Sequence, residues 1–235
     1  MNYERLRSGF AAGNYWMLRR SLIALGLGLL FAGRSSGDDR APVRPPAPVP
    51  VPPPTPEPVV PPNSMLDPRR WAIGPVIDGH NHSRGMPLNP EAHVDGWAFS
   101  FPLDGGDVHY VTTPSGSIVG ARAMKLDFRI EALPDVKLVP LGFAGKPASV
   151  SLYFQRAGDN WEAEGGFATY RWYSPKMFEL VPGDTSITVA LDDPGWISVY
   201  AATSWEMSSQ FIAAKENCGT VGMTFGGGFH RGHGV

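Results

Sequence analysis

Apolar and polar residues alternate along much of the chain from Val94 onward, and this pattern predicts β-strands. In residues 121–132, every second residue from Met124 to Ile130 is apolar, and the residues between them are charged. Residues 185–192 repeat the pattern. A period of two means that one face of a strand lies in the core and the other in solvent. Shorter candidate strands lie at 96–103, 109–113, 168–174, 195–201 and 220–225.

The stretch 148–157 is a further clear strand in this pattern. We expect Val150, Leu152 and Phe154 to face the core. The residues between them, Tyr153 and Gln155 among them, are then expected to face outward.

One segment departs from the strand pattern and predicts a helix, from Ser204 to Asn217. Ser204 is expected to cap its N-terminus, and Cys218 with Gly219 to end it. The predicted fold class is therefore all-β: an antiparallel two-sheet β-sandwich (jelly roll) with one short helix near the C-terminus. An N-terminal apolar helix and a disordered Pro-rich linker are expected to precede it.

Three stretches carry a resemblance to a known family: "ASVSLYFQRAGDNW", "LVPGDTSITVALDDPGWISVY" and "SSQFIAAKENCGTVGMTFGGGFHRGHGV". They resemble the middle strands and closing section of galactose-binding-like jelly rolls, a group that includes many carbohydrate-binding modules. The resemblance covers about 97–235 and implies a domain that binds a glycan. Those folds usually continue into a final core strand, so we expect either a very short last strand or a chain that is truncated at Val235.

The N-terminal 37 residues are expected to be an export signal or a short membrane anchor. Two arginines precede 13 uncharged residues, 21–33, which are fewer than a membrane span requires. The run ends like a bacterial lipoprotein signal, but Arg34 stands where the lipid-bearing cysteine would be. We therefore expect an exported protein, periplasmic or at the cell surface, without lipid. Its contact with the membrane would be through this N-terminal segment.

Residues 38–64 are predicted to be a disordered Pro-rich linker, since 41–62 contain 12 prolines in 22 residues. A stiff spacer behind an export signal holds a domain away from a membrane. The remaining residues, 65–235, are predicted to form the β-sandwich domain.

Composition excludes several classes of function. The net charge of −2 and the lack of a basic stripe argue against nucleic acid as a partner. A single cysteine excludes an internal disulfide. No cofactor is predicted, although a structural calcium is an alternative at Asp104 and Asp107, or at Asp192 and Asp193, because carboxylate-rich loops bind calcium.

A His-x-His motif follows the apolar run at Val76–Ile77 and resembles the first metal site of the amidohydrolase superfamily. That family uses a (β/α)₈ barrel of about 250 residues, which this chain does not offer. We therefore predict that His80 and His82 are not catalytic metal ligands. Asp78 and Asn81 are expected to bond nearby backbone in a turn-rich loop.

The predicted ligand-binding residues are Trp161, Tyr153, Gln155, Arg129 and Asp127. Sugars are bound by aromatic faces that pack on the ring and by planar polar side chains that bond hydroxyls. The leading hypothesis is a non-catalytic β-sandwich that binds a glycan or another surface ligand. Two alternatives stay open: a polysaccharide-degrading lyase or glycosidase on the same fold, with Glu162, Glu164, Tyr170 and His109 as candidates, and a structural envelope protein without a ligand.

The interrupted lipoprotein signal makes a testable prediction. The variant Arg34→Cys should become labelled with palmitate in cells, because it restores the thiol that a lipid requires, whereas the parent protein should stay unlabelled. If Arg34→Cys also stays unlabelled although it is exported, the resemblance to a lipoprotein signal carries no meaning.

Overall fold

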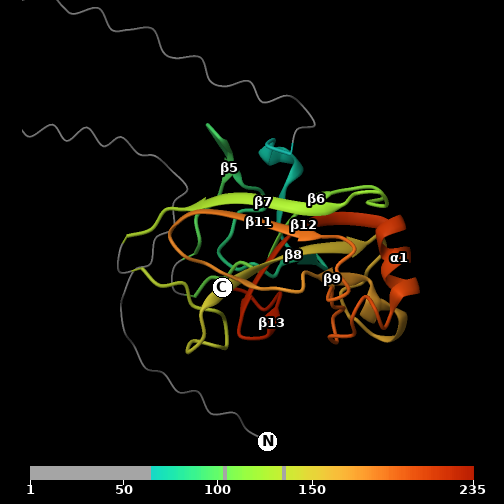
Figure 1. Ribbon diagram of the computed structural model, residues 1–235. Coiled ribbons are helices and arrows are strands. Elements are labelled where there is room, and N and C mark those ends of the chain that lie inside the picture. Colours follow the sequence, from blue (N-terminus) through green and yellow to red (C-terminus); the bar gives the residue numbers. More distant parts are fainter. Residues whose placement is uncertain (1–64, 103–104, 134–135) are drawn as a thin grey trace, which may run out of the picture. The chain divides into compact units, whose positions relative to one another are not determined.

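The computed structural model describes residues 65–102, 105–133 and 136–235, which form a mostly β structure (Figure 1). The predicted leader, 1–37, and the predicted linker, 38–64, lie outside the described residues. Within the described part of the chain, no helix is long and apolar enough to cross a membrane.

The main layer is a seven-stranded antiparallel sheet, and most of its strands coincide with predicted ones. Five strands follow the order β1-β6-β12-β8-β10, while β13 pairs with β12 and β9 pairs with β8. Strand β12 is paired on both sides by long neighbours, so it is the centre of the sheet. The strand bounds are Ala72–Gly74 (β1), Tyr110–Pro114 (β6), Ala148–Arg156 (β8), Arg171–Tyr173 (β9), Phe178–Glu179 (β10), Cys218–Gly227 (β12) and His230–Arg231 (β13).

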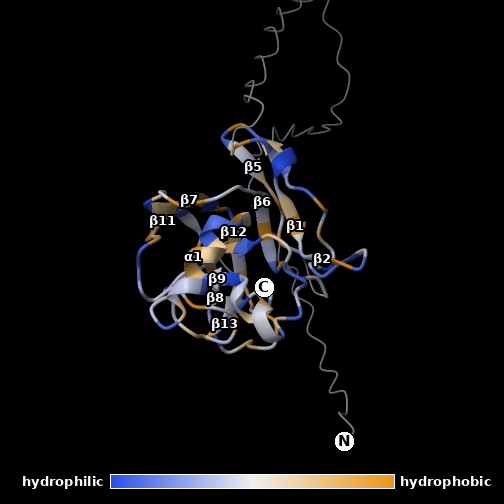
Figure 2. Cartoon of the chain, turned by 90° about the vertical axis from the view of Figure 1, so that its right-hand side faces the viewer, coloured by the Kyte–Doolittle hydropathy of each residue, from blue (hydrophilic) through white to orange (hydrophobic). Residues whose placement is uncertain are grey.

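A second layer consists of β7 (Ala123–Ile130) and β11 (Gly183–Ala190), which pair along their whole length. The predicted alternation is confirmed in both strands: Ile130 and Ile187 are buried, whereas the charged residues of β7 and the hydroxyl residues Ser186 and Thr188 of β11 are exposed. Figure 1 shows this pair lying along β12 and β8, and Figure 2 shows polar and apolar residues next to each other on it.

One hydrophobic core joins the two layers. Ile187 and Val189 of the second layer share it with residues of β8 and β12 such as Leu152 and Phe225. The predicted all-β, antiparallel fold class is thus confirmed. Trp97, Phe99 and Phe101 extend the core, but of the strand predicted at 96–103 only 96–98 form one, β5 (Gly96–Ala98), which pairs with β4 (Glu91–His93).

The His-x-His motif lies in a small hairpin of β2 (Val76–Ile77) and β3 (His80–Asn81), with both histidines exposed. The Asn81 amide donates to the Ile73 carbonyl at 3.0 Å, and its oxygen accepts from the Ser83 N–H at 2.9 Å. The expectation that Asn81 bonds nearby backbone is therefore confirmed. Among the described residues, no group of three or more His, Cys, Asp or Glu side chains is arranged to hold a metal.

The predicted helix is shorter than expected and begins later. It spans Ser208–Glu216 (α1), and Phe211 and Ala214 are its buried residues. Ser204 does not cap it. Instead Thr203 and Glu206 form a reciprocal pair ahead of the helix: the Glu206 carboxylate accepts from the Thr203 N–H at 2.8 Å, and the Thr203 hydroxyl accepts from the Glu206 N–H at 3.2 Å.

One further segment differs from its prediction. Residues 195–201 do not form a strand and contribute only isolated bridges at Ile197, because they turn back on themselves with the Ser198 N–H donating to the Ala202 carbonyl at 2.9 Å. Short 3₁₀ turns occur at Pro68–Arg70 (η1) and Gly165–Thr169 (η2). After β13, Val235 exchanges two backbone hydrogen bonds with Val108, at 3.0 and 3.1 Å, and its side chain lies in the core.

Gly222 in β12 lies close to the backbone of β6. A Cβ atom added there would come within 2.2 Å of the Val111 carbonyl oxygen, whereas a Cβ at Gly116 would meet open space. Gly222→Ala should therefore lower the free energy of unfolding by about 2–3 kcal/mol in urea titrations. The control Gly116→Ala should change it by less than about 1 kcal/mol. Equal effects of the two changes would contradict the close strand approach.

Candidate functional site

The large sheet has a second face that carries phenols and hydroxyls, which we call the tyrosine face. Register places Ala72, Thr112, Gly222, Tyr153 and Tyr173 in one row across five strands. The neighbouring rows add Tyr110 and Thr224 on one side and Thr220, Gln155 and Arg171 on the other.

The tyrosine face is mostly covered, which corrects the prediction that Tyr153 and Gln155 point to solvent. Both do lie on the face opposite Leu152, as alternation requires, but Tyr153 is completely buried and Gln155 nearly so. Trp161, Ile197 and Val199 pack against Tyr110, Tyr153 and Tyr173. The strand β8 is therefore buried on both faces.

Three phenols share this buried space. The hydroxyls of Tyr110 and Tyr173 lie 3.0 Å apart and share a hydrogen bond, and the Tyr153 ring lies 5.0 Å from that of Tyr110. Burial raises the pKa of Tyr153 and of Tyr173 well above the usual range, and it also raises the pKa of Tyr110. The three phenols therefore stay neutral and act as hydrogen-bonding groups.

Gln155 links the tyrosine face to a polar cluster at its edge. Its amide oxygen accepts hydrogen bonds from the Tyr153 hydroxyl and, at 3.2 Å, from the Thr220 hydroxyl. Its amide nitrogen donates to a carboxylate oxygen of Asp159 at 2.7 Å. These three bonds fix the orientation of the amide.

Trp161 stands next to this cluster in a left-handed backbone conformation, with φ of 69°. A tryptophan adopts such a conformation only where its surroundings hold it. Here the Asp159 carboxylate accepts from the Trp161 N–H at 3.2 Å, and Arg171 donates to the Trp161 carbonyl at 2.9 Å. The indole ring meets the Tyr110 ring edge-on at 5.1 Å, so Trp161 is partly buried.

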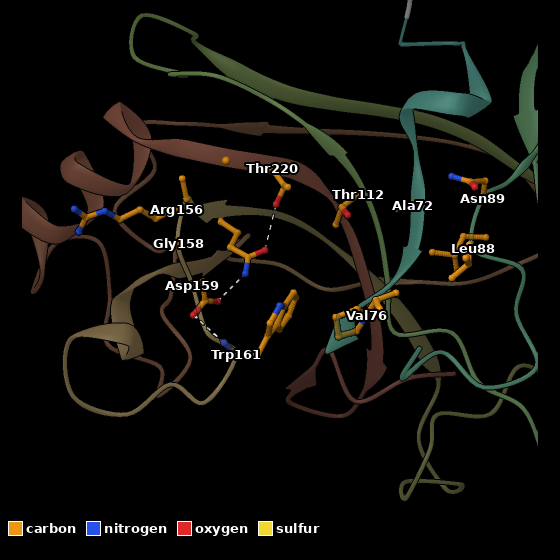
Figure 3. A pocket seen from close by; sticks show the side chains of 16 residues that line it. Ala72, Val76, Leu88, Asn89, Thr112, Arg156, Gly158, Asp159, Trp161 and Thr220 are labelled. Carbon is orange, nitrogen blue, oxygen red and sulfur yellow. Dashed lines mark hydrogen bonds between the residues drawn. The ribbon is translucent and has the colours of Figure 1, made fainter. Parts of the chain in front are cut away.

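An open hollow of about 590 Å³ lies beside Trp161, which we call the tryptophan hollow. Figure 3 shows the indole on one side of it and Val76 on the other. Thr112, Gln155 and Thr220 contribute polar groups from the sheet. The other lining residues are Ala72, Ile73, Gly74, Pro75, Leu88, Asn89, Arg156, Ala157, Gly158, Asp159 and Gly219.

The structure therefore brings together three of the five predicted site residues: Trp161 and Gln155 line the hollow, and Tyr153 lies buried next to them without lining it. The other two, Arg129 and Asp127, lie on β7 in the second layer and do not line the hollow. Each has a partner there: Arg129 pairs with Asp184 at 2.5 Å, and Asp127 accepts from Ser186 at 2.7 Å. They form an exposed charged face, where such pairs contribute little.

The residues considered for catalysis do not gather in the hollow. Glu162 and Glu164 are exposed, and Tyr170 lies under the Arg156 guanidinium at 4.7 Å. His109 lies elsewhere, between the Gly232 carbonyl at 2.9 Å and the Asp107 carboxylate at 3.1 Å.

Two of the four carboxylates that the sequence suggests as calcium ligands, those of Asp107 and Asp193, have partners within the protein. Asp104 lies outside the described residues. The buried Asp107 carboxylate is paired with Arg84 at 2.6 Å and with His109. Asp193 accepts from the Gly195 N–H at 2.8 Å, while Asp192 is exposed.

Sequence reasoning missed Asp159, Arg171, Thr112 and Thr220. A usable signal existed for Arg171, because a charged residue within the aromatic run "TYRWY" needs a buried partner. Asp159 in "GDN" looked like a turn residue, and the two threonines looked like ordinary strand residues.

Comparisons of the chain with protein-family models, with curated proteins and with solved structures found no match. The description of the site therefore depends on its own geometry.

The buried phenols predict a loss of stability at high pH. The folded state holds the Tyr153 proton more tightly than the unfolded state, so this stabilisation is complete below about pH 10 and is lost as the pH rises above it. Tyr153→Phe should make the fall in unfolding free energy above pH 10 shallower by about 1.4 kcal/mol per pH unit. Tyr200→Phe, at an exposed tyrosine, is the matched control and should leave the slope unchanged. An unchanged slope in Tyr153→Phe would contradict this account.

Proposed function

We propose that the chain is an exported or membrane-tethered, non-catalytic β-sandwich domain of the jelly-roll type that binds a glycan in the tryptophan hollow. The observation that carries the proposal is that the Trp161 indole forms one wall of the hollow, while polar side chains of the sheet, Thr112, Gln155 and Thr220, form its floor. The leader and the proline-rich spacer predicted from the sequence support a location outside the cytoplasmic membrane.

The Trp161 indole offers an apolar face of the kind that packs against the C–H face of a sugar ring. Its backbone is held at both the N–H and the carbonyl, so little conformational freedom is left to lose when a ligand binds. The volume of about 590 Å³ falls within the range of small-molecule sites, about 300–1,000 Å³.

The floor offers groups that bond hydroxyls. The Thr112 hydroxyl has no side-chain hydrogen bond to another described residue, and the Thr220 hydroxyl donates to Gln155 but keeps its lone pairs. The Gln155 amide uses one N–H on Asp159 and has a second one for which the described residues supply no partner. A ligand with several hydroxyls fits this mixture of donors and acceptors.

The enzymatic alternative receives less support from the same geometry. A glycosidase needs two carboxyl groups across the scissile bond, whereas Asp159 is the one carboxylate among the described residues that line the hollow. A lyase that uses tyrosine as a base needs a phenol of lowered pKa, and the buried phenols here have raised ones.

A glycan array followed by calorimetric titration of the full chain tests the proposal. Trp161→Ala should weaken binding of each glycan that the native protein binds by tenfold or more, since it removes the aromatic wall, and tenfold corresponds to about 1.4 kcal/mol. The matched control is Trp205→Ala, because Trp205 is 80% exposed and does not line the hollow. It should bind like the native protein.

Two results would overturn the proposal. One is the absence of binding to any plant, algal or bacterial polysaccharide on the array, which would favour a structural envelope protein. The other is a bound glycan whose affinity depends on Trp205 and not on Trp161.

A further inference from the structure

Two buried charges lie at the wall of the tryptophan hollow: Asp159 is one of its lining residues, and Arg171, which does not line it, pairs with Asp159. Asp159 and Arg171 approach each other to 2.8 Å, and their side chains are only 1% and 8% exposed. A buried ion pair of this kind costs desolvation energy, which further hydrogen bonds to its two partners offset. The Arg171 Nε approaches Asp159 as an ion-pair contact without hydrogen-bond geometry.

The other hydrogen bonds of Asp159 and Arg171 are made with Trp161 and Gln155, which both line the tryptophan hollow. One oxygen of Asp159 accepts from the Trp161 N–H at 3.2 Å, and the other accepts from the Gln155 amide at 2.7 Å. Arg171 donates to the Trp161 carbonyl at 2.9 Å, and its guanidinium carbon lies 5.0 Å from the centre of the indole ring. Both charges are thus used to hold Trp161 and Gln155.

The guanidinium also occupies a position over the indole ring. Arg171 itself does not line the hollow, so its charge lies behind the aromatic wall. The indole is therefore held between Arg171 and the open space.

The other charged side chain that lines the hollow, that of Arg156, points away from Trp161 (Figure 3). Among the described residues of the lining, Arg156 is the one cation, and its guanidinium lies 4.7 Å from the centre of the Tyr170 ring. Figure 3 shows this side chain extending away from Trp161. The polar and aromatic side chains of the lining, apart from Arg156, are thus an indole, two amides, two hydroxyls and the Asp159 carboxylate, whose charge is paired with Arg171.

We infer that the tryptophan hollow selects an uncharged, hydroxyl-rich ring, and that the Asp159–Arg171 pair sets this selectivity by neutralising its own charges while it positions Trp161. This inference depends on the proposed function and narrows it to neutral glycans. A uronate or a sulfated sugar would leave its anion next to Asp159 without a counter-charge, and burial of an unpaired charge is costly.

The first test compares neutral and acidic glycans on the native full-length chain. The glycans bound on the array should be neutral, and their affinity should change by less than about twofold between low and high salt, because no ion pair with the ligand is screened. Preferred binding of acidic glycans, weakened by salt, would overturn the inference and leave glycan binding itself intact. If no glycan binds at all, the proposed function fails first.

The second test inverts the selectivity. Asp159→Asn leaves the Arg171 cation without its anion next to the hollow. Binding of neutral glycans should weaken by tenfold or more, because Trp161 loses a contact, and acidic oligosaccharides such as oligogalacturonate should gain salt-sensitive binding. The matched control is Asp184→Asn, which removes the anion of the exposed pair with Arg129 and should change neither. If Asp159→Asn retains neutral binding with native affinity, the positioning role is wrong.

A third measurement needs no glycan and no folded Asp159 variant. The emission of Trp161, taken as the difference between the native protein and Trp161→Phe, reports on the charge next to the indole. When each quenching constant is divided by that of free N-acetyltryptophanamide, iodide and caesium should quench it to similar extents in the native protein, because the local charges cancel. Normalised quenching by iodide several times stronger than by caesium would show an exposed positive charge and would contradict the inference.

Discussion

Strand β8 is buried on both of its faces. One face packs against apolar residues, and the other carries polar groups that need hydrogen-bond partners. On one face Val150, Leu152 and Phe154 join the apolar core under β7 and β11. On the other, Tyr153 and Gln155 are buried with polar groups that must each find a partner. The hydrogen bonds from Tyr153 to Gln155, and from Gln155 to Asp159, meet this requirement and lead directly to the hollow.

The Asp159–Arg171 pair is the point at which fold and site meet. Register brings Arg171 of β9 opposite Gln155 of β8, and the short loop after β8 returns Asp159 to the same place. The same two charges then hold Trp161 in a backbone conformation that an unsupported tryptophan would leave. The rigidity of the aromatic wall is in this way a consequence of sheet pairing.

The alternation in β7 and β11 was sufficient to predict their faces, because one face of this pair does meet solvent. The alternation did not predict that both faces of β8 are buried. Polar residues such as Tyr153 and Gln155 occur both on solvent-exposed faces and on buried polar ones, so residue type alone does not separate the two cases. This face of β8 is covered by Trp161, in the loop after β8, and by Ile197 and Val199, whose alternation predicted a strand at 195–201 where the chain instead turns back on itself.

The candidate site was predictable in part for a similar reason. Trp161 and Gln155 were found from residue type, because aromatic and amide side chains suit a sugar wherever they stand. Arg129 and Asp127 satisfied the same criterion and yet lie on the other layer, where cross-strand register gives Arg129 its partner Asp184. Residue type selects candidates, whereas only pairing between distant strands decides which of them meet.

The most direct measurement of the central claim is the indole N–H spectrum of the protein as a neutral glycan is added. The seven tryptophans give one indole resonance each, and Trp161 is assigned by its loss in Trp161→Phe. The account predicts that the Trp161 resonance shifts and saturates with ligand, while that of Trp205 stays in place. A glycan that binds and leaves the Trp161 resonance unmoved would contradict it.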